Sequence, residues 1–80
     1  MITVRVKLFA TLRSYRPGLK LGEALAVDLP AGATVQQLLE GLGVPTGEVK
    51  LIFVDGLVRE MRHVLADDDE LGIFPPVGGG

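Results

Sequence analysis

The chain has 80 residues, 48% of them hydrophobic and 22% charged, which is the composition of one folded domain and not of a disordered segment. Eight basic against ten acidic side chains give a formal net charge of -2, which offers no electrostatic basis for binding nucleic acid or an anionic membrane. The absence of cysteine excludes disulfides, iron–sulfur clusters, thiolate zinc sites and an internal thiol nucleophile. Because the net charge does not favour nucleic acid or a membrane, we expect the partners to be proteins.

The N-terminal part of the chain is predicted to form two strands of a hairpin. Residues 2–9, ITVRVKLF, alternate between an apolar face and a face that holds Arg5, Lys7 and Phe9. Arg5 and Lys7 also interrupt the apolar character of this stretch, and no run of about 18 apolar residues occurs elsewhere, so we expect a cytoplasmic protein without a membrane segment. A stretch ATLRSY that can form one helical turn and a loop follow, and residues 23–29 alternate again as a second strand.

A helix is predicted to begin at Thr34. Thr34 and Gln37 have the spacing of a capping box, in which each side chain accepts a hydrogen bond from the backbone N–H of the other residue. Gly43 followed by Pro45 provides the stop signal. The residues between form one apolar stripe for packing on a sheet: Val35, Leu38, Leu39 and Leu42.

The C-terminal half is predicted to add a hairpin and a last strand. Residues 50–54, KLIFV, read as a third strand, and its apolar residues on both faces suggest that it is covered on both sides. Asp55-Gly56 is a strong two-residue turn leading into LVREM. An acidic turn over residues 67–70 precedes a short strand over residues 71–74, and Pro75 then ends the ladder pairing.

The predicted order of two strands, a helix and further strands indicates an α+β fold with a mixed sheet and one main helix packed on one face. At this length the order resembles the ubiquitin-like β-grasp, which implies that the first and last strands lie parallel in the middle of the sheet. The missing cysteines exclude the ferredoxins of this fold. We expect a β-grasp domain over residues 1–74 and an extended, flexible tail over residues 75–80 that ends in Gly79-Gly80.

Four stretches carry a more specific resemblance: LFATLR, GATVQQLLEGL, VDGLV and ADDDELGIFPPVGGG. Together they resemble the small subunit of molybdopterin synthase, the MoaD branch of the MoaD/ThiS sulfur carriers, from Met1 to Gly80, and the tail is the most specific part. Two positions depart from the family pattern. Asp68 stands where members often have glycine, although aspartate tolerates a left-handed backbone, and Gly78 adds a third glycine that should loosen the tail.

The resemblance implies a carrier and sulfur donor, with catalysis in its partners. In that family an ATP-dependent, E1-like adenylyltransferase of the MoeB/ThiF type converts the carboxylate of the terminal glycine, here Gly80, to an acyl-adenylate. A sulfur donor then produces a thiocarboxylate. The thiocarboxylate supplies sulfur for molybdenum cofactor biosynthesis in a heterotetramer with the larger MoaE-type subunit. The partner uses the ATP, and this chain is expected to bind no cofactor and no metal.

The composition of the tail suits this chemistry. A free terminal carboxylate, with an ordinary pKa near ~3.5, is an anion and a poor electrophile, so it needs activation. Gly79 and Gly80 present no side chain to a narrow partner site, while Pro75 and Pro76 favour an extended path away from the sheet. An extended tail spans roughly 20 Å at ~3.3 Å per residue, enough to enter a neighbouring active site.

Two aromatic residues are the candidate docking surface at the root of the tail. Strand parity places Phe9 and Phe74 on the sheet face opposite the helix, at the end where the tail departs. With Pro75, Pro76, Val77 and Gly78 they are expected to contact the partner enzymes. The alternative is partial burial of the two rings beneath the loop of residues 14–22.

Other candidate sites have weak sequence support. Adjacent carboxylates in the acidic turn diverge and lack the alternate spacing of a calcium loop. His63 has no nearby nucleophile, and no glycine-rich phosphate loop occurs. Arg5 and Lys7 on the open face either steer an acidic partner or are simply solvated.

Three rival functions remain open at this stage. One is a carrier of the same chemistry that serves thiamine, cysteine or tRNA thiolation. Another is a ubiquitin-like protein modifier, in which Gly80 ends in an isopeptide bond to a lysine. The last is a β-grasp interaction module whose tail does no chemistry.

Overall fold

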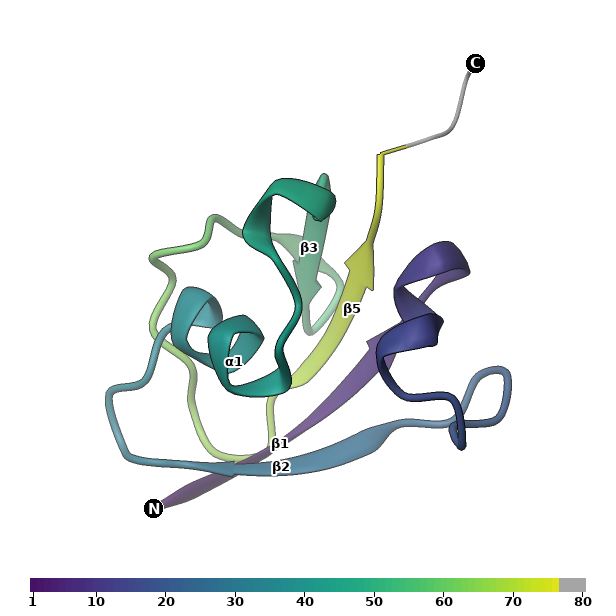
Figure 1. Ribbon diagram of the computed structural model, residues 1–80. Helices are drawn as coiled ribbons and strands as arrows, with labels where there is room; N and C mark the ends of the chain where they lie inside the picture. The colour runs from purple at the N-terminus through teal and green to yellow at the C-terminus, as the bar shows by residue number, and fades with distance from the viewer. Residues whose placement is uncertain (77–80) are drawn as a thin grey trace.

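The structure is a computed structural model, and it describes residues 1–76. Within these residues the chain forms a five-stranded sheet in the order β2-β1-β5-β3-β4, with the helix α1 packed across one face (Figure 1). The strands are β1 (Ile2–Leu8), β2 (Leu25–Leu29), β3 (Leu51–Val54), β4 (Leu57–Val58) and β5 (Glu70–Phe74). The first and last strands are parallel neighbours, and every other pairing is antiparallel. The predicted β-grasp fold is confirmed.

The second strand begins later than the sequence pattern suggested, at Leu25 and not at Glu23. Gly22 has a left-handed backbone with φ of 79°. The carboxylate of Glu23 accepts a hydrogen bond from the backbone N–H of Lys20 at 2.8 Å, so Glu23 belongs to the turn before the strand. The alternating pattern therefore extended beyond the part of the chain that pairs with β1.

The helix α1 (Val35–Leu42) begins and ends as predicted. The backbone N–H of Gln37 donates to the Thr34 hydroxyl at 3.3 Å, and the backbone N–H of Thr34 donates to the Gln37 side chain at 2.9 Å. Gly43 ends the helix in the left-handed conformation, with φ of 76°. The capping box predicted from two residue types is thus present in full.

The segment between β4 and β5 holds the start of the helix against the sheet. The first two helical N–H groups, which have no acceptor inside the helix, donate to the carbonyls of His63 and Met61 at 3.0 and 2.9 Å. The N–H of Leu65 donates to the carbonyl of Ala33 at 2.8 Å. These three backbone hydrogen bonds therefore fix the irregular segment to the N-terminal end of α1.

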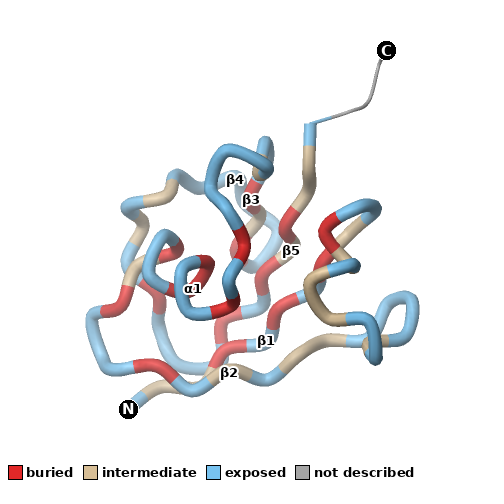
Figure 2. The backbone as a smooth tube through the Cα atoms, in the orientation of Figure 1, coloured by how far each residue is buried: buried red, intermediate tan, exposed pale blue. Residues whose placement is uncertain are grey.

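The core lies between the sheet and α1, where the buried parts of the backbone trace face one another (Figure 2). Its fully buried side chains include Val4, Val6, Leu12, Val35, Leu38, Leu39 and Ile73. The opposite sheet face is open. The expectation that the third strand is covered on both sides is wrong: Ile52 and Val54 are buried beneath α1, but Leu51 on the other face is 40% exposed. No second layer of the described residues covers that face.

The acidic turn fixes the start of β5 against β1. A side-chain oxygen of Asp67 accepts the N–H of Thr3 at 2.8 Å, and the N–H of Asp68 donates to the carbonyl of Thr3, also at 2.8 Å. Asp68 has φ of 68°, a left-handed conformation that aspartate tolerates. Separately, none of the helices within residues 1–76 combines the length and apolar character needed to cross a bilayer.

Candidate partner-binding site

The candidate site is built on the open sheet face, at the end where the chain leaves β5. The register pairs Leu8 with Ile73, and the N–H of Phe9 donates to the carbonyl of Ile73 at 3.1 Å, so Phe9 and Phe74 lie side by side. Their rings stack with centroids 4.3 Å apart and planes within 5°. Both are half-buried. The predicted placement of these two residues at one end of the open face is confirmed.

Gly72 makes room for this stack. A Cβ atom at position 72 would lie 3.3 Å from a ring carbon of Phe9 and 3.3 Å from a ring carbon of Phe74. These separations are tighter than ordinary van der Waals contact, so a side chain at this position would displace one or both rings. The glycine therefore allows both rings to lie low over the centre of the sheet.

A third ring belongs to the same cluster. Phe53 meets Phe74 edge to face, with centroids 5.5 Å apart and an interplanar angle of 80°. It stands directly across from Gly72 in the antiparallel pairing of β3 with β5. Phe53 alternates with Ile52 and Val54 along β3, but no sequence pattern identified β3 as the neighbour of β5.

The three rings border a groove of about 380 Å³ on the open face. Its lining combines the aromatic cluster with small residues and with charges from the central strands: Arg5, Lys7, Phe53, Glu70, Gly72 and Phe74. An apolar floor with a few charged groups at the rim is the usual make-up of a site that binds another molecule.

Of the two basic side chains at this rim, Arg5 has acidic ion-pair partners and Lys7 has none among the described residues. The Arg5 guanidinium lies 3.9 Å from a carboxylate oxygen of Asp68 and 3.9 Å from one of Glu70. All three side chains are substantially exposed, so each ion pair contributes little to stability. Lys7 is exposed and forms no ion pair with any residue that the structure describes.

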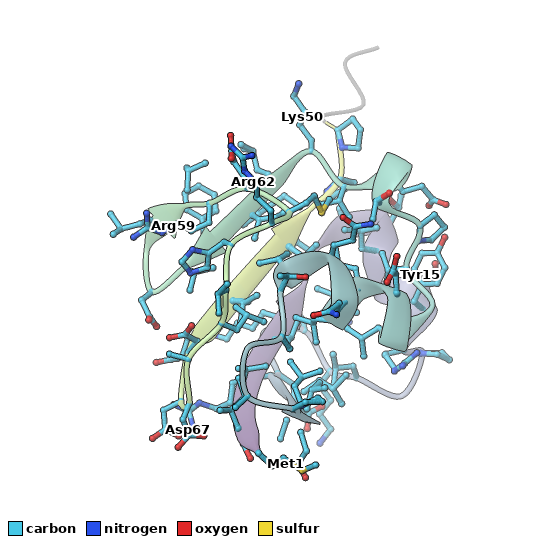
Figure 3. All side chains as sticks on the ribbon, turned by 90° about the vertical axis from the view of Figure 1, so that its left-hand side faces the viewer. Met1, Tyr15, Lys50, Arg59, Arg62 and Asp67 are labelled. Carbon is cyan, nitrogen blue, oxygen red and sulfur yellow. The ribbon has the colours of Figure 1, made fainter. Side chains whose placement is uncertain are left out.

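The root of the tail lies beside this groove. The backbone N–H of Lys50 donates to the carbonyl of Phe74 at 2.8 Å, which holds the last strand residue in place. Pro75 is half-buried and Pro76 is exposed, and the chain leaves the sheet along the direction of β5 (Figure 1). Figure 3 shows Lys50 at this end of the molecule and Asp67 at the other.

The structure therefore brings four of the predicted site residues together: Phe9, Phe74, Pro75 and Pro76. The other four lie outside the described residues: Val77, Gly78, Gly79 and Gly80. Their predicted roles remain predictions.

The acidic turn has a structural role in this fold. Asp69 accepts the N–H of Ala66 at 2.8 Å, and Asp67 accepts the N–H of Thr3, so both carboxylates are committed to backbone donors. Across residues 1–76 no group of three or more histidine or acidic side chains is arranged to hold a metal ion.

One polar contact outside the groove has no signal in the sequence. Tyr15, at the end of the 3₁₀ helix η1 (Ala10–Tyr15), donates its hydroxyl hydrogen to Glu48 in η2 (Thr46–Glu48) at 2.7 Å. This hydrogen bond, together with burial and repulsion from the Glu48 carboxylate, raises the pKa of Tyr15 above its ordinary value of 10.0. No periodic pattern signals a contact between residues so far apart in the chain.

The strand order, the single covering helix and the open aromatic face define a ubiquitin-like β-grasp protein. The family model described as Mut7-C ubiquitin matches residues 1–78, so the chain belongs to the Mut7-C ubiquitin family. A comparison with curated proteins finds no match.

Several solved structures share the fold over almost the whole chain. Two are of small archaeal modifier protein 1 from Haloferax volcanii. The first has 24% identity and a TM-score of 0.75, covering 96% of this chain and 100% of its own. The second has 26% identity and a TM-score of 0.73, covering 98% and 99%.

Another similar structure is a Pyrococcus furiosus protein named for subunit 1 of a molybdopterin converting factor. Its identity is 26%, its TM-score is 0.73, and the match covers 96% of this chain and 100% of that one. The chain thus groups with ubiquitin-like small modifiers and MoaD-like proteins together. The family model is not specific to the MoaD branch that the sequence resemblance suggested.

Proposed function

We propose that this domain is a sulfur carrier whose Gly80 carboxylate is activated by an ATP-dependent, E1-like adenylyltransferase and then converted to a thiocarboxylate. The observation that carries the proposal is the junction at the end of β5. There an aromatic stack and two prolines directly precede Val77 and three glycines. The C-terminal segment therefore begins beside an aromatic surface that is suited to binding a partner protein.

The chemistry needs two displacements at the tail. An oxygen of the Gly80 carboxylate attacks the α-phosphorus of ATP, and pyrophosphate leaves to give the acyl-adenylate. A sulfide donor then attacks the acyl carbon, AMP leaves, and one proton is released as the thiocarboxylate forms. The partner enzyme binds ATP, while this chain supplies the acyl group.

The likeness to the Pyrococcus furiosus protein supports a narrower role as small subunit of molybdopterin synthase. In that role the thiocarboxylate enters the active site of a MoaE-type large subunit, in a heterotetramer, and donates its sulfur during molybdenum cofactor biosynthesis. Phe9, Phe74, Pro75 and Pro76 contact the partner, because aromatic side chains commonly anchor protein interfaces.

The likeness to small archaeal modifier protein 1 favours a second function, that of a protein modifier. Activation of Gly80 is the same in both functions. In the modifier, a lysine amine and not sulfide attacks the acyl carbon, so AMP leaves and an isopeptide bond forms.

Intact-mass spectrometry of the protein from its native cells tests the proposal. We expect a chain that ends at Gly80, with a fraction that carries one oxygen-to-sulfur exchange. Incubating unmodified protein with ATP, the adenylyltransferase and sulfide should produce the same species, and omission of ATP is the control. A native chain extending past Gly80 would contradict the carrier chemistry, and lysine-linked conjugates without any thiocarboxylate would replace it with the modifier.

A further inference from the structure

The groove on the open face contains a recess with an aromatic wall. Gly72 lies at its floor, and the rings of Phe9 and Phe74 already approach the position of a Cβ atom there to 3.3 Å, so the two rings occupy the space directly above the glycine. Phe53 closes the β3 side of the cluster through its edge-to-face contact with Phe74. The accessible part of the groove therefore lies beside the stacked rings, where an apolar group would contact aromatic carbon of Phe53 and Phe74.

The size of the groove suits a protein side chain better than a large cofactor. Its volume of about 380 Å³ lies near the lower end of the range of about 300 to 1,000 Å³ that is typical of binding sites. A partner can thus anchor one apolar residue here, with its neighbours remaining at the rim.

The rim favours a negative charge at one particular place. Lys7 lies directly opposite Gly72 in the parallel pairing of β1 with β5. It is exposed and has no ion pair within the described part of the chain, whereas Arg5 is flanked by Asp68 and Glu70. An incoming carboxylate beside the recess would therefore be attracted by Lys7, and an incoming ammonium group would be repelled.

We propose that the groove binds a segment of a partner protein in which one apolar side chain packs against Phe53 and Phe74 beside Gly72 and a neighbouring carboxylate pairs with Lys7. This inference rests on the proposed function, which requires a protein to dock on this face. It adds that the docking protein is recognised by an apolar side chain next to a carboxylate.

Two small probes test whether Lys7 pairs with a carboxylate next to an apolar side chain. They are an N-acetylated leucyl-glutamate dipeptide amide and the matching leucyl-lysine dipeptide amide. Amide-resolved NMR titration should show millimolar binding, with shifts centred on Gly72, Lys7 and Phe74. We expect the glutamate probe to bind about threefold more tightly, as for a solvent-exposed ion pair. Lys7→Glu should reverse this preference, and the control Lys20→Glu, in the loop before β2, should leave it unchanged.

Gly72→Ala tests the floor of the recess. Its backbone lies outside the left-handed region, so alanine is sterically allowed there, but the added methyl group meets both stacked rings. This variant should weaken both dipeptides alike while its spectrum stays that of a folded domain. Equal affinity for the two dipeptides in the unmodified protein, or shifts centred away from Gly72, would overturn the inference.

Three further outcomes are informative, and the last two separate this inference from the proposed function. If groove resonances shift with protein concentration alone, the occupant is a second copy of the chain and the inference is wrong. Adenylation of Lys7→Glu at the unmodified rate would also refute it, while leaving the carrier chemistry intact. Absence of adenylation in the unmodified protein, with the expected preference for the glutamate probe, would refute the carrier chemistry and support the groove.

Discussion

The stacked pair of Phe9 and Phe74 should stabilise the junction of the two central strands. Phe74→Ala removes a half-buried ring, and half of the roughly 1.5–3 kcal/mol for complete burial is about 1 kcal/mol. Loss of the contacts with Phe9 and Phe53 adds about 0.5–1.5 kcal/mol for each aromatic pair. Because the cluster is partly exposed, we expect the lower end, about 2 kcal/mol in total. A domain of this size has only about 4–12 kcal/mol of stability.

A double-mutant cycle isolates the stack itself. The single variants Phe9→Ala and Phe74→Ala and the double variant are unfolded in urea, followed by circular dichroism. The double variant should be less destabilised than the sum of the single ones by about 0.5–1.5 kcal/mol. A control cycle of Phe9→Ala with Val58→Ala, on the edge strand, should give a coupling near zero. Coupling of the two phenylalanines below about 0.3 kcal/mol would refute the stacked arrangement in solution.

Three other outcomes are expected. Tyr15 is the only tyrosine and tryptophan is absent, so an absorbance titration should show its pKa above 10.0, and Glu48→Gln should lower it. Because the folded-state pKa is raised, the stability that Tyr15 contributes is present below its ordinary pKa and is lost as pH rises through the folded value. Thr34→Ala removes the helix cap and should cost about 1 kcal/mol, a fall in Tm of roughly 4–8 °C in a thermal melt, and an unchanged Tm would count against the cap. Deleting Gly79 and Gly80 should leave Tm nearly unchanged but abolish adenylation, and a large loss of stability would contradict the prediction that these two glycines do not contribute to the folded domain.

The sequence by itself determined the local elements and most of their limits. Alternation over residues 2–9 specified the strand and its buried face, because successive side chains in a strand point to opposite sides. The helix limits followed from Thr34, Gln37 and Gly43, since capping depends on groups only a few residues apart. The order of elements then restricted the fold to a β-grasp, and parity placed Phe9 and Phe74 on one face.

The tertiary structure alone decided what surrounds these residues. Phe53 joins the aromatic cluster because β3 pairs with β5. The choice of neighbouring strand depends on long-range packing, which leaves no local pattern in the sequence. The groove beside the aromatic cluster and the hydrogen bond of Tyr15 to Glu48 also depend on the pairing of distant segments. A sequence pattern fixes which way a side chain points from its own strand or helix, but its partners depend on how distant segments are brought together by the burial of a shared core.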